Sequence, residues 1–124
     1  MTITLTLPWP PSTNRSHEHV RGRVILREST RQYREDATAA IFDQLGIPPR
    51  IARPVRIVAT YHPPRGYHGD LDNLIKQTLD ALQCGGVLAN DKHVVAIWAS
   101  KGVAGAACVQ LTIEDAEGAT YGTW

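Results

Sequence analysis

The amino-acid sequence predicts an α+β fold, a small mixed β-sheet with two helices in the order ββαβαββ. Short stretches in which polar and apolar residues alternate mark strands near both ends of the chain. Two longer stretches with apolar residues three and four positions apart mark the helices, and proline- or glycine-rich breaks follow them. A length of 124 residues is the size of one domain, so we expect a single domain over residues 1–124.

The first half of the chain is expected to form two strands and one helix. Residues 2–7 alternate threonine with isoleucine or leucine, as a half-buried strand does, and the prolines that follow cannot donate to a sheet. Residues 23–26 form a short apolar run that predicts a second strand. A helix capped by Ser29 or Thr30 should run to about Leu45, before a glycine and two prolines stop it.

The second half is expected to add a strand, a helix and a closing pair of strands. Residues 54–61 alternate and are rich in β-branched side chains, which favour strands. Residues 71–84 present apolar side chains on one helical face, and two glycines follow the last turn. Residues 93–99 and 106–113 indicate two strands joined by a turn of small residues. Trp98 alternates with core positions, so we expect it to be buried.

The composition favours a folded protein in the cytoplasm. Apolar residues make up 43% and charged residues 20% of the chain, which does not fit a disordered protein. No apolar run approaches the roughly 20 residues of a membrane span, and the first residues lack the pattern of a secretory signal. We therefore expect no membrane partner, and we expect the two cysteines to be reduced thiols.

A basic segment precedes the first predicted helix and continues into it. The net charge is only +1, yet six arginines fall within twenty residues: Arg15, Arg21, Arg23, Arg27, Arg31 and Arg34. Such a cluster can contact the phosphates of a nucleic acid, and Asn14 can add another contact. Two plainer interpretations remain, in which the arginines form a solvated face and Asn14 closes a loop. His17 and His19 are expected in that loop and are weak candidates for a transition-metal site.

Acidic residues gather where the second helix begins. Asp70 and Asp72 lie two residues apart at its start, and Lys76 follows one turn after Asp72 on the same face. Clustered carboxylates repel one another, so a fold that gathers them neutralises them with a metal ion, a proton or a cation. Oxygen ligands suit Mg²⁺ or Mn²⁺. If the glycine turn returns Asp91 to the helix start, three carboxylates can hold such an ion beside a phosphate, whose charge Lys76 can stabilise.

The same residues have a purely structural interpretation. Asp70 or Asp72 can cap the helix, and Asp72 can favour its dipole and form a surface ion pair with Lys76. Asp91 can be an ordinary turn residue. Spacing alone does not decide between the two interpretations, because aspartates are common at helix starts.

Three segments in order carry a resemblance to a known family. They are Leu7-Pro8-Trp9-Pro10-Pro11-Ser12-Thr13-Asn14, the Asp70–Asp72–Lys76 helix, and Asn90-Asp91 with Val94-Val95. Together they resemble the RusA family of Holliday junction resolvases, small metal-dependent endonucleases common in phages and prophages. The resemblance extends from Leu5 to about Lys101. It departs from some members at Asn90, where they carry a second aspartate, and in the loop 62–69, which holds one arginine where they carry a basic run.

The resemblance implies a homodimer that binds branched DNA, the four-way junction, and nicks two strands symmetrically in DNA recombination and repair. The family's catalytic and metal-binding acids match Asp70, Asp72 and Asp91 here. Its catalytic lysine matches Lys76, which is also a candidate DNA contact. The implied cofactor is Mg²⁺, which Mn²⁺ can replace, with no small-molecule cofactor. The alternative is a non-catalytic branched-DNA-binding protein that retains the fold.

Overall fold

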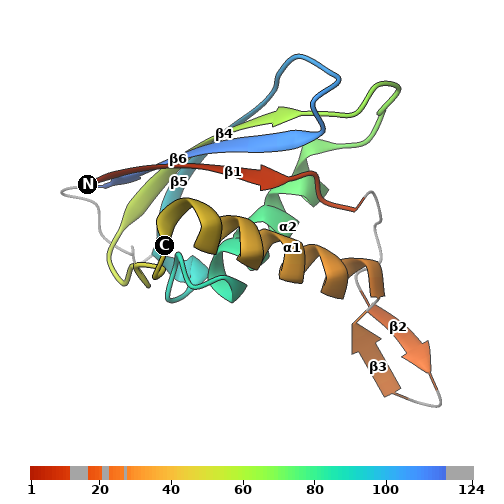
Figure 1. The fold of residues 1–124 in the computed structure, drawn as a ribbon, viewed down its shortest axis with the longest axis horizontal. Coiled ribbons are helices and arrows are strands. Elements are labelled where there is room, and N and C mark those ends of the chain that lie inside the picture. The colour runs from red at the N-terminus through yellow and green to blue at the C-terminus, as the bar shows by residue number, and fades with distance from the viewer. Residues whose placement is uncertain (12–16, 21–22, 27, 117–124) are drawn as a thin grey trace.

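The computed structural model describes residues 1–11, 17–20, 23–26 and 28–116. They form an α+β fold in which two helices cover one face of a four-stranded sheet (Figure 1). The expected fold class is therefore confirmed. No helix among these residues is long and apolar enough to cross a membrane.

Every strand and helix expected from the sequence is present, and two short elements are added. In chain order the elements are β1 (Thr2–Pro8), β2 (His17–Val20), β3 (Arg23–Leu26), α1 (Glu28–Leu45), β4 (Val55–His62), α2 (Leu71–Cys84), the 3-10 turn η1 (Asp91–His93), β5 (Val94–Lys101) and β6 (Cys108–Asp115). The expectation of a loop around His17 and His19 is wrong, because β2 pairs along its backbone with β3. Three polar residues and one valine carry no strand pattern of their own.

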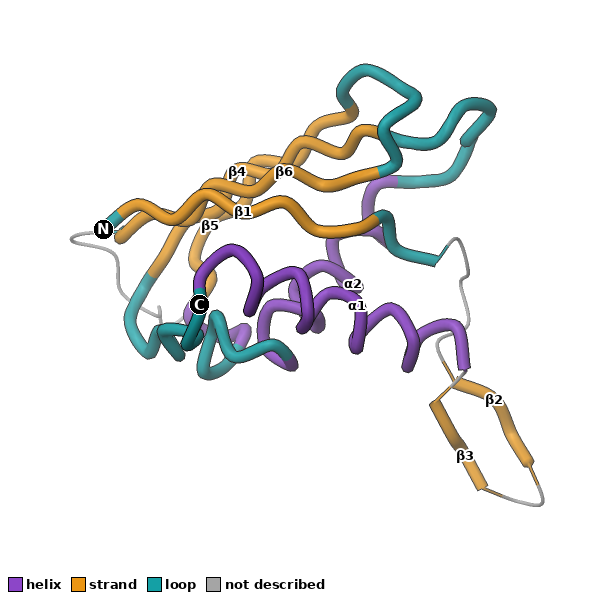
Figure 2. Tube along the Cα trace, viewed as in Figure 1, coloured by secondary structure: helices purple, strands orange, loops and turns teal. Residues whose placement is uncertain are grey.

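The main sheet is mixed and has the strand order β1-β6-β4-β5 (Figure 2). β4 pairs with β5 in parallel, whereas β1 and β4 both pair antiparallel with β6. A parallel pair needs a crossover connection, and α2 provides it, so α2 runs back along the sheet against the direction of β5. β3 does not join this sheet, since it forms a separate two-stranded ribbon with β2.

The core lies between the sheet and the two helices. Alternate strand residues face inward, so Leu5, Ile57 and Leu111 are each at most 3% exposed. Ile41 of α1 and Leu74 of α2 are each 1% exposed on the helix faces that meet the sheet. Burying one such side chain contributes about 1.5–3 kcal/mol to folding, so this core fixes the position of both helices.

The expected burial of Trp98 is wrong, because both helices cover the same face of the sheet and the described residues leave the other face open (Figure 1). Trp98 of β5 is 73% exposed, although it alternates with apolar neighbours. Ile97 and Ala99 pack against the core instead. A period of two shows which residues share a face, but it does not show which face the helices cover.

A buried hydrogen bond joins α2 to the sheet. The hydroxyl of Thr78 donates to the carbonyl of Leu74 at 2.7 Å, so its oxygen accepts from the Tyr61 hydroxyl at 2.8 Å. Burial raises the pKa of Tyr61 to about 12, and the hydrogen bond with Thr78, which lowers this pKa, offsets only part of that rise. Because this folded-state pKa lies above the ordinary value of 10.0, the protonated Tyr61 stabilises the fold at neutral pH, and that stabilisation is lost as the pH rises above 10.0.

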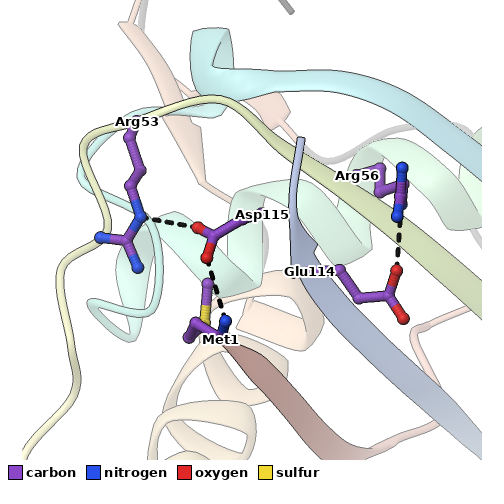
Figure 3. Close-up of polar contacts among 5 residues, drawn as sticks. All are labelled: Met1, Arg53, Arg56, Glu114 and Asp115. Atoms are coloured by element: carbon purple, nitrogen blue, oxygen red, sulfur yellow. Dashed lines mark hydrogen bonds and ion pairs between the residues drawn. The ribbon is translucent and has the colours of Figure 1, made fainter. Parts of the chain in front are cut away.

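Exposed ion pairs align strand ends at the N-terminal end of β1 (Figure 3). Asp115 accepts from the amino group of Met1 at 3.0 Å and from Arg53 Nε at 2.7 Å, and Arg56 Nε donates to Glu114 at 3.0 Å. The hydrogen bond from Arg53 holds the pKa of Asp115 below its ordinary value. Exposed pairs of this kind contribute little stability, so they set the register of the strand ends more than the stability of the fold.

Candidate active site

Two acidic residues of the expected site lie at the start of α2, and both are exposed. Asp70 directly precedes the helix, with φ −90° and ψ 151°, and its side chain makes no capping hydrogen bond. Asp72 lies in the first turn, where its Oδ1 accepts from the backbone N–H of Asn73 at 3.0 Å. Neither carboxylate therefore acts as the side-chain cap that the structural interpretation requires.

Lys76 follows one turn later, on the same exposed side of α2 as Asp72. Within the described part of the chain, no ion pair involves Lys76. The surface ion pair between Asp72 and Lys76 is thus not formed. Lys76 is exposed and lies about one helical turn after Asp72.

A cleft of about 660 Å³ opens beside this helix start. It is lined by the chain after β1, by the loop 64–69 and by the first turns of α2. Tyr67 stands in its wall, with its ring packed edge-on against Trp9 at 5.1 Å between ring centres. Burial raises the pKa of Tyr67, and the negative charges of Asp70 and Asp72 raise it further. The Tyr67 hydroxyl lies 3.5 Å from the backbone carbonyl of Asp70, so Tyr67 stands beside the helix start.

Asp91 lies at the other end of α2. It opens the turn η1, and its backbone N–H donates to Oε1 of Gln83 at 3.0 Å. Asn90 caps this turn, because its Oδ1 accepts from the backbone N–H of Lys92 at 2.9 Å. The amide at this position therefore has a structural role in placing Asp91. Nothing in the sequence pointed to Gln83, since a polar residue in the last turn of a helix does not signal such a contact.

The three acidic residues do not converge within one protomer. Asp72 and Gln83 are eleven residues apart, which corresponds to roughly 16 Å along the axis of α2. β5 then leads back along the sheet, and Nζ of Lys101 at its end donates to the carbonyl of Gly69 at 2.9 Å. Among the described residues, no three His, Cys, Asp or Glu side chains group closely enough to hold a metal ion. The expectation that the glycine turn returns Asp91 to the helix start is wrong, because that turn leads into the far end of β5.

The side of α2 opposite its buried residues is exposed at both ends and partly buried near its middle. The residues that share this side at about 100° of rotation per residue are Asp72, Lys76, Leu79 and Gln83, here called the α2 strip. The opposite side holds the buried residues Leu74, Thr78, Ala81 and Leu82. Leu79 is partly buried and lies near the middle of the strip. The α2 strip thus has the Asp72 carboxylate at one end, an apolar side chain near its middle and Gln83, which contacts Asp91, at the other end.

Two of the arginines expected to contact phosphate lie on α1. Arg31 pairs with Glu28 at 3.2 Å, and Arg34 pairs with Asp80 of α2 at 3.7 Å. The first pair is exposed and the second is half-buried, and pairs this accessible to water are weak and screened by salt, so a DNA phosphate can compete for both guanidinium groups. Of the other candidates, Arg23 lies in β3, and Asn14, Arg15, Arg21 and Arg27 lie outside the described residues.

The donor chemistry at the start of α2 fits a hard divalent cation. Asp70 and Asp72 offer carboxylate oxygens that are exposed and not used for capping. Mg²⁺ commonly takes one or two protein carboxylates and completes its shell with water and substrate phosphate. The chain therefore offers a two-carboxylate site with a lysine beside it, and Asp91 lies at the other end of α2.

Comparison with known proteins identifies the family to which the chain belongs. Residues 8–114 match the family described as Endodeoxyribonuclease RusA. The crossover junction endodeoxyribonuclease RusA of Escherichia coli strain K12 is 40% identical over 94 residues, which cover 76% of this chain and 78% of that protein. The proteins of the same name from Shigella sonnei and Enterobacteria phage 82 are 39% and 38% identical over the same shares. The match includes β4, α2 and β5, which carry the candidate site, and the chain belongs to the RusA family of endodeoxyribonucleases.

Proposed function

We propose that this protein is a divalent-metal-dependent endodeoxyribonuclease that resolves four-way DNA junctions by paired, symmetric nicks. The observation that carries the proposal is the start of α2, where two exposed carboxylates stand one turn before an exposed lysine in a chain of the RusA family. The relatives described above are named crossover junction endodeoxyribonucleases, which is the activity proposed here.

The residues at the start of α2 are suited to hold a reacting phosphate. Asp70 and Asp72 would bind Mg²⁺, which lowers the pKa of a bound water and offsets charge on the phosphate. Lys76 would place its ammonium beside the same phosphate and stabilise the charge that develops as the P–O bond breaks. The first backbone N–H groups of α2 and the helix dipole also favour an anion at this end.

We further propose that Asp91 acts in the site of a second copy of the chain. Two copies of α2 packed antiparallel about a two-fold axis would bring the partner's Asp91 next to Asp72, because Asp72 lies at one end of the α2 strip and Asp91 contacts Gln83 at the other. Leu79, near the middle of the strip, would pack against its own copy. Such a homodimer has two identical sites, and paired nicks require two.

The arginines of the segment 15–34, including Arg31 and Arg34, are proposed to contact the junction arms together with Asn14. A net charge of +1 is too small to bind DNA uniformly over the surface. Localised contacts to phosphate release counterions, so we expect junction affinity to fall steeply with salt. Two such surfaces in a two-fold dimer can match the two-fold symmetry of the junction.

Cleavage of an end-labelled four-way junction tests the proposed function. With Mg²⁺ or Mn²⁺ the protein should introduce two symmetric nicks, and with EDTA it should bind the junction without cutting it. A linear duplex of the same sequence, which should stay intact, is the control. Binding without cleavage at any metal concentration would favour the alternative of a non-catalytic branched-DNA-binding protein, and absence of both would exclude the two together.

Replacing Lys76 should slow the chemical step more than it weakens binding. Lys76→Ala should lower the single-turnover rate by about 10²–10³-fold, as loss of one group that stabilises transition-state charge does. Junction affinity in EDTA should change little, since one phosphate contact among many is lost. Rapid-quench cleavage and gel-shift titration measure the two quantities. Equal losses in both would make Lys76 an ordinary phosphate contact.

A further inference from the structure

A hydrogen bond joins the candidate site to the last residue of β5. Nζ of Lys101 donates to the carbonyl of Gly69 at 2.9 Å, and the same ammonium lies 5.7 Å from the centre of the Tyr67 ring. The Gly69 carbonyl belongs to the peptide group that leads into Asp70. The contact therefore holds the backbone at the point where the first carboxylate is attached.

Tyr67 holds the same segment by a second contact. Its hydroxyl donates to the backbone carbonyl of Asp70 at 3.5 Å, while its ring is supported by Trp9. A Cβ atom on Gly69 would overlap the Tyr67 hydroxyl, so glycine is needed for this close approach. The peptide groups around Gly69 are thus bonded by the lysine and by the tyrosine.

The end of β5 is itself fixed by neighbouring backbone bonds. The N–H of Gly102 donates to the carbonyl of Tyr61 at 2.8 Å, and the N–H of Gly105 donates to the carbonyl of Pro63 at 2.7 Å. These bonds fasten the turn after β5 to the segment that leads from β4 into the cleft. Lys101 therefore acts from a rigid support, although its side chain is exposed.

We propose that Lys101 is a positioning residue for Asp70, acting through the Gly69 carbonyl together with Tyr67. No capping hydrogen bond fixes the Asp70 side chain, so the direction of its carboxylate depends on the backbone that carries it. Contacts that orient a metal ligand in this way change metal affinity or activity by about 10- to 100-fold when they are removed. This inference rests on the proposed function, in which Asp70 binds a divalent cation.

A plain phosphate contact is the competing interpretation of Lys101. An exposed lysine that only binds phosphate contributes to junction affinity in EDTA and to its salt dependence. It does not change how the DNA-free protein binds a metal ion. A positioning residue does change metal binding in the absence of DNA, and it also changes the mobility of the backbone that it holds.

The experiment compares wild-type protein with Lys101→Met, Lys101→Arg and Arg65→Met. Lys101→Met keeps the length of the side chain but removes its donor, and Lys101→Arg keeps a cationic donor. Arg65→Met is the matched control, because it removes a positive charge from the wall of the same cleft. Two quantities are measured on the DNA-free protein: the Mn²⁺ dissociation constant by calorimetry, and hydrogen exchange of the backbone amides of residues 67–72.

Lys101→Met should bind Mn²⁺ about tenfold more weakly, and the amides of residues 67–72 should exchange faster at an unchanged melting temperature. Lys101→Arg and Arg65→Met should both resemble the wild type.

If Lys101→Met bound Mn²⁺ as tightly as the wild type and its amides exchanged at the wild-type rate, the proposal would be overturned and the proposed function would stay intact. If the wild-type protein itself bound no Mn²⁺, the proposed metal dependence would fail. In that case faster exchange in Lys101→Met would still support the anchoring of Asp70, and unchanged exchange would refute it.

Discussion

Mixing the Asp72→Asn protein with the Asp91→Asn protein should restore junction cleavage that neither variant supports alone. Each variant by itself should lose about two to three orders of magnitude in rate, as removal of one charge-stabilising group from an active site does. If Asp91 acts in the partner's site, a mixed dimer has one site with both substitutions and one site with neither. The intact site should nick one strand, so the product should be nicked junctions and not resolved duplexes.

The matched control is a mixture of Asp70→Asn with Asp72→Asn, co-expressed in the same way. These two residues lie at the start of the same helix, so every site of a mixed dimer carries one substitution and should stay inactive. Random assembly makes about half of the dimers mixed, so nicking in the first mixture should reach about a quarter of the wild-type rate. Denaturing gels of end-labelled strands measure this directly. No restoration in either mixture, with each variant inactive alone, would mean that Asp91 acts in its own protomer.

The ends of helices and strands that are marked by residues adjacent in the sequence could be predicted from the sequence. α2 begins after Asp70 and ends before Gly85, because an aspartate before the apolar pattern and a glycine pair after it mark helix ends. β1 ends at Pro8, where the strict alternation of threonine with apolar residues stops. These signals are local, so they need no knowledge of what the element packs against.

The arrangement of the site depends on contacts between distant parts of the chain, and the sequence could not supply it. The spacing of Asp91 after Gly85-Gly86 indicates a turn, but not that β5 starts at the opposite end of α2 from Asp70. The contacts of Gln83 and Lys101 span eight and thirty-two residues and follow no periodic pattern. Sequence reasoning therefore identified the acidic residues as candidates and placed two of them, while the third required the fold.

Leu79→Glu should separate the proposed dimer and abolish cleavage while the protomer stays folded. Leu79 lies near the middle of the α2 strip, where it packs against the edge of the core but is only partly buried, so part of its side chain is accessible to a partner. In an antiparallel α2 pair it would bury two carboxylates against each other, and an uncompensated buried charge costs about 3–5 kcal/mol. That cost corresponds to about a hundredfold or more in the dimer dissociation constant. Light scattering at micromolar concentration and far-UV circular dichroism measure assembly and folding.

Phe42→Glu is the matched control for this substitution. Phe42 is 65% exposed on α1 and lines an apolar cleft of about 690 Å³, so it offers a second surface on which a partner could dock. If the α2 strip is the interface, Phe42→Glu should remain dimeric and active. If Phe42→Glu were monomeric and Leu79→Glu dimeric, the interface would lie over α1 and the proposed pairing of α2 would be wrong.

A monomeric Leu79→Glu protein would also separate assembly from chemistry. It keeps Asp70, Asp72 and Lys76 together at the start of α2, so every residue that one protomer contributes to its own site is still present. Loss of cleavage in that protein would mean that these three residues are insufficient and that the partner's Asp91 is required. The length of α2 would then explain why cleavage depends on assembly. Asp72 and Asp91 lie at opposite ends of this helix, roughly 16 Å apart along its axis, so both can reach one phosphate only when a second copy of α2 lies antiparallel to the first.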